Sequence, residues 1–206
     1  MSKFLITGTG RCGTTYCQRV LTSMGLNVTH QTLFTFGTMR ACAPSQVEWG
    51  SVDGEASFMA VPWLREIKET GVKIIHVYRD RNLVVDSWLR LGLFGDQMHI
   101  SHPLFYPHVG GKNRNPRRRA EYFYDHWTRS CNDHADTIMH IEDANPSQLA
   151  QAVGRYDLYA DANGDLTDGA KHAWLLDNDI NSSVSLLKEQ VRYYRSPAKY
   201  KGEGRA

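Results

Sequence analysis

The sequence predicts an α/β fold of three layers, in which helices flank a mostly parallel β-sheet. Two observations lead to this prediction. Short apolar runs, typical of buried parallel strands, alternate along the chain with segments in which apolar residues recur at helical spacing. The stretch GTGRCGTT, rich in glycine, lies between the first apolar run and the first helical segment. Strand, glycine-rich loop and helix in this order predict a parallel sheet with a binding site at its strand ends.

Length and composition favour a single domain over residues 1–206, with a core from 3 to 153. The chain has 24 Lys and Arg residues against 22 Asp and Glu, and its net charge of +2 requires neither nucleic acid nor a membrane as partner. The sequence contains neither a leader-like N-terminus nor a run of roughly 20 apolar residues. The four cysteines lack CxxC or metal-ligand spacing, so we expect reduced thiols and a cytoplasmic protein.

The residue pattern in the first third of the chain predicts two strands and one helix. Phe4–Ile6 is a short apolar strand that runs into the glycine-rich stretch. Helical spacing of apolar residues follows over Cys17–Met24, and Gly25 ends that helix. Leu26–His30 is a second extended segment. Residues 31–61 mix Gly, Ser, Pro and acidic residues, and we expect a loop there with at most a short helix.

The middle of the chain predicts a second strand–turn–helix unit. Pro62 opens a helix at its first position, and Gly71 ends it. Val72–Tyr78 is apolar enough for a central parallel strand, and Asn82–Leu91 is the helix after it. Residues 92–116 show no sustained period, and a loop of this length inside a domain is typical of a binding loop.

The last part of the chain alternates in the same way before its pattern weakens. Arg117–Ala135 predicts a helix, Thr137–Ile141 a strand, and Asn145–Val153 a helix that Asn and Pro begin. An amphipathic helix is expected over Val184–Tyr194, followed by a tail over 196–206 that is flexible or ordered by a ligand.

The glycine-rich stretch has the composition of a phosphate-binding loop. It includes three glycines, one arginine and a pair of adjacent threonines: Gly8, Gly10, Gly13, Arg11, Thr14 and Thr15. Glycines let backbone N–H groups converge on an anion, the next helix adds its positive end, and the arginine and hydroxyls add donors. A P-loop for nucleoside triphosphates has Lys where Thr14 stands, so ATP or GTP hydrolysis is disfavoured. We therefore expect a nucleotide-binding fold of the P-loop type that holds a terminal phosphate.

A second anion position is predicted where the middle strand ends. Arg79 follows the strand, and Ser87 lies eight residues on, in the second turn of the next helix. Both belong to the carboxyl edge of a parallel sheet, where the glycine-rich stretch also lies, and a guanidinium with a hydroxyl suits a phosphate. The alternative is structural: Arg79 pairs with Asp80 or Asp86, and Ser87 is a small packing residue.

GTGRCGTT, followed by VYRD and a Ser eight positions after its Arg, resembles the sulfotransferases that use 3′-phosphoadenosine 5′-phosphosulfate (PAPS). The resemblance runs from about Lys3 to Leu149 and includes AEYFYDHWTRSCNDHAD and MHIEDANPSQL. It implies PAPS as co-substrate, 3′,5′-adenosine bisphosphate (PAP) as product, and no metal. The acceptor would be a hydroxyl or amine of a carbohydrate or small molecule.

The resemblance also implies roles for individual residues. The 5′-phosphosulfate would lie against the loop residues Gly10, Arg11, Cys12, Gly13, Thr14 and Thr15, with Arg11 neutralising the departing phosphate. Arg79 and Ser87 would bind the 3′-phosphate. In the tail, Lys201 and Gly202 would close over that phosphate. Sulfuryl transfer moves a group with a single negative charge, so loop amides and Arg11 suffice without a metal.

The base that takes the acceptor's proton has two candidates. Glu55 precedes the helix that leads to Arg79 and lies near the place where many members of the family have a catalytic His, and it is slightly favoured over His30. Gln31 follows His30 where related bacterial proteins often have Glu, which excludes a carboxylate there. For both Glu55 and His30 the alternative is a purely structural side chain.

Two other observations concern the acceptor and the competing functions. The loop 92–116 is expected to shape the acceptor pocket, and the basic segment Lys112–Arg119 either attracts an anionic acceptor or is a solvated helix start. A P-loop kinase or other nucleotide phosphotransferase is the first competing interpretation. A relative that binds PAP or PAPS without catalysis is the second.

Overall fold

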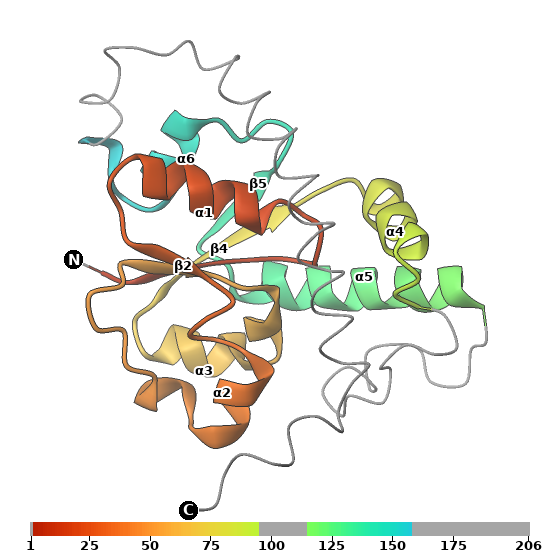
Figure 1. Cartoon of the computed structure of the whole chain (residues 1–206), viewed down its shortest axis with the longest axis horizontal. Coiled ribbons are helices and arrows are strands. Elements are labelled where there is room, and N and C mark those ends of the chain that lie inside the picture. Colours follow the sequence, from red (N-terminus) through yellow and green to blue (C-terminus); the bar gives the residue numbers. More distant parts are fainter. Residues whose placement is uncertain (1, 95–114, 158–206) are drawn as a thin grey trace, which may run out of the picture. The chain divides into compact units, whose positions relative to one another are not determined.

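The sheet is parallel throughout the part of the chain that the computed structural model describes, residues 2–94 and 115–157 (Figure 1). Five strands pair in the order β2-β3-β1-β4-β5, and every pair is parallel. Their bounds are β1 Phe4–Thr7, β2 Val28–His30, β3 Gly54–Ala56, β4 Lys73–Tyr78 and β5 Thr137–His140. The predicted α/β class is therefore confirmed.

Helices flank both faces of this sheet. Their bounds are α1 Thr14–Ser23, α2 Phe36–Ala41, α3 Leu64–Glu69, α4 Arg81–Arg90, α5 Pro116–His134 and α6 Pro146–Ala152, with short 3₁₀ helices η1 Pro44–Gln46 and η2 Phe58–Trp63. Figure 1 shows α1 and α6 on one face and α3 and α5 on the other, and within each pair the helices are in contact.

The strand order places the carboxyl end of β1 at the point where the chain changes direction. From β1 the chain crosses over α1 to β2 at one edge, whereas from β3 it crosses over α3 to β4 on the other side of β1. In open parallel sheets such a point leaves a crevice at the strand ends, where ligands bind. The glycine-rich stretch between β1 and α1 lies at this point.

Residues 31–61 differ from the expected loop, because they contain β3 between β2 and β1. The strand GEA is short and has a carboxylate at its centre, so no apolar pattern marks it in the sequence. Partners on both sides supply its hydrogen bonds: Leu5 and Thr29 are the register neighbours of Glu55. Tertiary pairing thus makes a strand that local propensity does not predict.

The helix predicted near Pro62 begins at a different residue. Pro62 was expected to open a helix at its first position, but it lies inside η2, which Ser57 caps, and α3 begins at Leu64.

The helix Val184–Tyr194 and the tail 196–206, including Lys201 and Gly202, lie outside the described residues, as does most of the loop 92–116. The described residues belong to one compact unit, 1–164, so a single domain over the whole chain stays a prediction.

The main core lies on the α3 and α5 face of the sheet. Its largest side chains are aromatic: Trp88 packs edge-on against Phe123 at 5.4 Å between ring centroids, and Phe123 stacks on Trp127 at 4.5 Å. The Trp127 indole nitrogen donates to the carbonyl of Phe58 at 3.1 Å, so its burial leaves no polar atom without a partner. This aromatic cluster packs α4 against α5.

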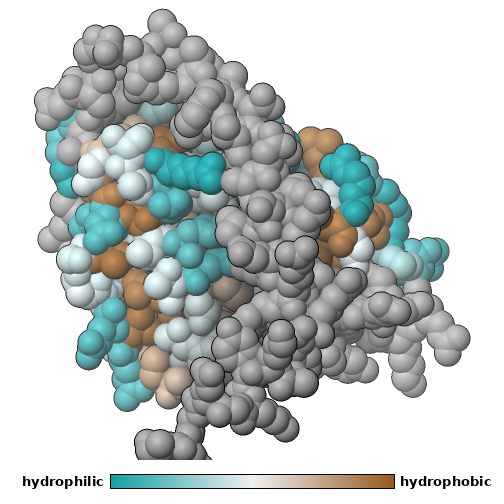
Figure 2. Space-filling model, viewed as in Figure 1, coloured by the Kyte–Doolittle hydropathy of each residue, from teal (hydrophilic) through white to brown (hydrophobic). Residues whose placement is uncertain are grey.

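The described surface has a mixed character. Figure 2 shows hydrophilic and hydrophobic residues interspersed over the described part of the face it presents. Four large apolar side chains are exposed among the described residues: Leu83, Tyr122, Ile138 and Tyr156. Among the described helices, none has the length and apolar composition that crossing a bilayer requires.

The close contact between Gly54 and Phe4 generates a stability prediction. A Cβ at Gly54 would lie 2.0 Å from the Phe4 ring, which is buried, whereas a Cβ at Gly37 in α2 would meet nothing closer than 3.5 Å. We expect Gly54→Ala to lower the free energy of unfolding by about 1–3 kcal/mol through overpacking. Gly37→Ala, the control, should stay within about 1 kcal/mol of wild type. Urea unfolding measures the stability of both variants. Equal effects of the two substitutions would contradict the close packing of Gly54 against Phe4.

Candidate functional site

The glycine-rich loop, Gly8–Gly13, turns sharply between β1 and α1. The amide of Cys12 donates to the carbonyl of Thr9 at 3.2 Å, and Arg11 and Gly13 have left-handed φ angles of 75° and 96°. Gly13 is the N-cap residue of α1, and no side chain caps that end. The first amides of α1 therefore have no intrahelical acceptor and lie at the positive end of the helix dipole.

Two of the loop glycines are required by close packing. A Cβ at Gly8 would lie 2.1 Å from the carbonyl oxygen of Val77, at the end of β4. A Cβ at Gly13 would lie 2.5 Å from the Ile141 side chain, in the turn after β5. Gly10 differs, because a Cβ there would make only an ordinary contact, 3.6 Å from the Trp88 indole nitrogen. The loop is thus held against the ends of β4 and β5.

Arg11 and Ser87 contact each other. The Nε of Arg11 donates to the Ser87 hydroxyl at 3.1 Å, across 76 residues of sequence. Ser87 is 8 % exposed and lies in α4, so the predicted second anion position is beside the loop, at the same edge of the sheet. The structural alternative of a mere packing residue does not describe Ser87, because its hydroxyl has a charged partner.

Arg79 pairs with neither of the aspartates considered from the sequence. The carboxylate of Asp80 accepts from the amides of Asn82 and Leu83, and so caps α4. Asp86 accepts from Arg117 instead. The Nε of Arg79 donates to Glu142 at 2.7 Å, and Glu142 follows β5. The sequence does not single out Glu142, although its place after a strand that neighbours β4 is the signal that would have found it.

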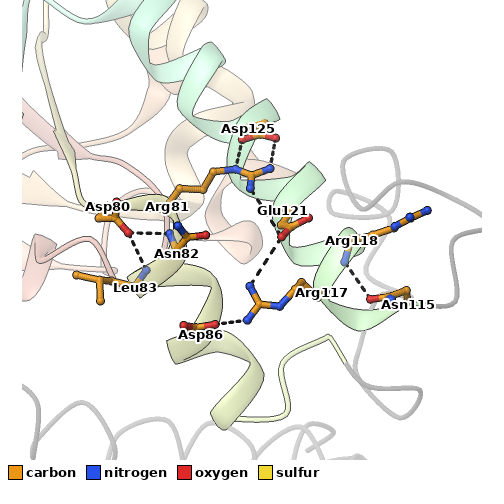
Figure 3. Close-up of polar contacts among 10 residues, drawn as sticks. All are labelled: Asp80, Arg81, Asn82, Leu83, Asp86, Asn115, Arg117, Arg118, Glu121 and Asp125. Carbon is orange, nitrogen blue, oxygen red and sulfur yellow. Dashed lines mark hydrogen bonds and ion pairs between the residues drawn. The ribbon is translucent and has the colours of Figure 1, made fainter.

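A network of ion pairs holds α4, and with it Ser87, against α5 (Figure 3). Arg81 binds both carboxylate oxygens of Asp125, each at 2.7 Å. Arg117 reaches Asp86 on α4 and lies 3.8 Å from Glu121. A bidentate pair within a network orients two helices more firmly than isolated surface pairs do.

The same network accounts for much of the basic segment Lys112–Arg119. Arg117 is engaged with Asp86, and Arg119, which is buried, donates to the carbonyl of Phe94. Arg118 points away from the network in Figure 3. Lys112 and Arg114 lie outside the described residues. Two of the three described arginines therefore stabilise the fold. Attraction of an anionic acceptor by this segment stays a prediction, and fewer of its positive charges are available for that role.

Neither the amide nor the thiol of Cys12 is available to a ligand. Its amide donates to Thr9, and its thiol is 0 % exposed. Burial raises the pKa of this thiol to about 12, although nearby hydrogen bonds and the charge of Arg79 act in the opposite direction. Its side chain packs inside the glycine-rich loop, and the cofactor contact that the resemblance implies for Cys12 stays a prediction.

His30 lies against the start of α1. Its Nε2 is 3.1 Å from the hydroxyl of Thr15, and the ring is half-buried at the end of β2. Burial, with a smaller contribution from the charge of Arg19, lowers the pKa of His30 to about 4. The imidazole is therefore neutral at physiological pH and has a nitrogen that can accept a proton.

Glu55 lies on the opposite face of the sheet from His30. Thr29 is the register neighbour of Glu55, and the residues on either side of a strand position point to the other face, so His30 faces away. Glu55 is 0 % exposed and accepts from the Thr29 hydroxyl. Burial raises the pKa of its carboxyl, although the hydrogen bonds to it act in the opposite direction.

The carboxylate of Glu55 shapes the segment that follows β2. It accepts from the amides of Thr32 at 2.7 Å and Leu33 at 3.1 Å. Gln31, just before them, has a left-handed φ of 52°, so the chain turns sharply where it leaves β2. Glu55, favoured from the sequence as the base, has a structural task here.

The described residues contain no group of three or more His, Cys, Asp or Glu side chains with the geometry of a metal site. No family model and no curated protein matches this chain. The functional interpretation therefore rests on the geometry of the residues above.

The buried carboxyl of Glu55 generates a pH prediction. Its pKa is raised above the ordinary value of 4.5, so the unfolded chain ionises first as the pH rises. The contribution of Glu55 to the free energy of unfolding is therefore present below pH 4.5 and lost as the pH rises through its folded-state pKa. Glu55→Gln keeps an acceptor for Thr32 and Leu33 but does not ionise. We expect the stability of Glu55→Gln to rise relative to that of wild type between pH 4 and pH 8, because only wild type loses this contribution as Glu55 ionises.

Urea unfolding of both proteins at several pH values measures this difference. Glu69→Gln, at an exposed position of α3, is the matched control and should follow wild type at every pH. A constant difference between Glu55→Gln and wild type across the range would show that Glu55 ionises alike in both states.

Proposed function

We propose that this chain is a PAPS-dependent sulfotransferase of the P-loop type. The observation that carries the proposal is the hydrogen bond between Arg11 and Ser87, which joins the glycine-rich loop to the second anion position. The resemblance in sequence assigned these residues to two different phosphates of one nucleotide. A nucleotide with phosphates at both ends of its ribose requires two such positions side by side.

The first position would hold the 5′-phosphosulfate. It combines the amides at the start of α1, the guanidinium of Arg11 and the hydroxyls of Thr14 and Thr15. Thr14 is buried at the start of α1, and the hydroxyl of Thr15 is 3.1 Å from Nε2 of His30. These donors are oriented before a ligand arrives, which is the condition for strong stabilisation of developing charge.

The reaction would be an in-line displacement at sulfur. The acceptor's oxygen or nitrogen forms a bond to sulfur while the bond from sulfur to the 5′-phosphate oxygen breaks. The electron pair of that bond stays on the phosphate, and PAP leaves with the added charge. Arg11 and the loop amides would neutralise this charge, and a base would take the acceptor's proton.

His30 is the base that this geometry favours. When the Thr15 hydroxyl donates to a phosphate, it must accept from Nε2–H of His30, with which it is in contact at 3.1 Å. That tautomer leaves Nδ1 of the neutral ring as a proton acceptor. Glu55, in contrast, already accepts hydrogen bonds from Thr29, Thr32 and Leu33.

Two further points complete the proposal. The acceptor would be a hydroxyl or amine of a carbohydrate or small molecule, and transfer would need no metal. All four cysteines are free, which fits a cytoplasmic protein.

Selective nucleotide binding is the first test. We expect 3′,5′-adenosine bisphosphate at 100 times its Kd to stabilise the protein by about 2.7 kcal/mol in thermal unfolding, with 5′-AMP and Mg²⁺–ATP at the same concentration giving much less. Arg79→Ala should weaken bisphosphate binding roughly ten- to hundredfold, through loss of a charged hydrogen bond. Preference for Mg²⁺–ATP would favour a kinase, and equal effects of all nucleotides would refute the proposal.

Turnover is the second test, with labelled sulfate transfer from PAPS to a library of hydroxyl and amine acceptors. His30→Gln, whose side-chain amide can keep a donor to the Thr15 hydroxyl but cannot act as a base, should lower kcat by about 100-fold or more while the Kd of the bisphosphate changes less than threefold. Wild-type kcat/KM should fall as the pH drops through about 4, where His30 takes up a proton. Glu55→Gln is the comparison and should stay within about tenfold of wild type. The reverse order of the two variants would make Glu55 the base, and bisphosphate binding without transfer to any acceptor would indicate a non-catalytic relative.

A further inference from the structure

The turn after β5, Ile141–Ala144, touches the site at three places. Ile141 fills the space beside Gly13, where a Cβ would clash. The carbonyl of Ala144 accepts from the Tyr16 hydroxyl at 3.3 Å. Glu142, between them, binds Arg79. The turn therefore contacts the glycine-rich loop, the first helix and the second anion position, yet no role was assigned to it from the sequence.

The backbone of this turn is firmly placed. The amide of Ile141 donates to the carbonyl of Tyr78 at 2.9 Å, and Ala144 donates back to Ile141 at 3.2 Å. The residue after Tyr78 is Arg79, whose own carbonyl accepts from the Tyr124 hydroxyl. Glu142 and Arg79 thus leave two neighbouring strands at adjacent points, and both main chains are held by hydrogen bonds.

The Glu142 side chain is held as well. One carboxylate oxygen accepts from the Nε of Arg79 at 2.7 Å, and the other lies 3.2 Å from the Nε2 of His140. His140 packs on Tyr78, with 4.9 Å between ring centroids, and its Nδ1 is 3.4 Å from Asp143. With both oxygens in contact, the carboxylate has one orientation.

The contact through Nε leaves a particular part of Arg79 available. A guanidinium binds a phosphate in a fork of two N–H groups. Glu142 takes the Nε side, and the described residues provide no partner for the two terminal nitrogens of Arg79. The Arg79 side chain is 33 % exposed, so these nitrogens can reach a ligand.

We infer that Glu142 is a positioning residue that aims the terminal nitrogens of Arg79 at the 3′-phosphate and so determines selection of a 3′-phosphorylated nucleotide. This inference rests on the proposed function. A free arginine side chain samples many rotamers, and ordering it on binding costs affinity. Glu142 orders it beforehand. Because Glu142 also brings a negative charge, its presence would weaken phosphate binding if it acted through charge alone.

The test separates positioning from charge by nucleotide discrimination, the Kd of 5′-AMP divided by the Kd of 3′,5′-adenosine bisphosphate, measured by calorimetry. Glu142→Ala removes both the contact and the charge, whereas Glu142→Gln keeps an oxygen that accepts from Nε. Asp143→Ala, one residue on, removes one charge and the contact with Nδ1 of His140, while both oxygens of Glu142 keep their partners. Circular dichroism and thermal unfolding check that each variant is folded.

We expect Glu142→Ala to reduce the discrimination at least fivefold, and Glu142→Gln and Asp143→Ala to stay within twofold of wild type. In an Arg79→Ala background, Glu142→Ala should cause no further change. Unchanged or increased discrimination in Glu142→Ala overturns the inference while the proposed function stands. A wild-type protein without preference for the bisphosphate overturns the proposed function itself, and the inference with it.

Discussion

Contact of the glycine-rich loop with the ends of β4 and β5 determines where every other part of the site lies. Gly8 and Gly13 have room for a hydrogen atom and nothing larger, because the Val77 carbonyl and the Ile141 side chain occupy the space of a Cβ. At this distance the loop cannot shift without a shift of the strand ends beneath it. The orientation of α1, the direction of its first amides and the place of Arg11 follow from that contact.

The charged side chains around the loop have different roles, which depend on the residues they contact. Arg81 and Arg117 hold α4 to α5 and so place Ser87, whereas Arg11 and Arg79 lie at the strand ends. The two acids that matter most differ in the same way. Glu55 is buried and shapes the segment after β2, and Glu142 is partly exposed and holds a side chain of the site. Composition alone does not separate these tasks, since all of them use the same residue types.

The two faces of the sheet explain why the candidate bases are not equivalent. His30 and Glu55 are close in the sheet, but the alternation of side chains along parallel strands sends them to opposite faces. His30 comes to the α1 side and contacts Thr15, and Glu55 comes to the side of the aromatic core. An acid in that place serves the main chain around it, because buried amides require acceptors.

The sequence by itself determined the α/β class, the strand, loop and helix order, and the second strand–turn–helix unit with Arg79 and Ser87. Apolar periodicity and glycine position are local properties, and they predict elements directly. Strand β3 was missed because its three residues form a strand only through pairing on both sides. The partners of Arg11, Arg79 and Glu55 were likewise beyond the sequence. Each contact joins segments 22 to 76 residues apart, and only the packed sheet brings their side chains within hydrogen-bonding distance.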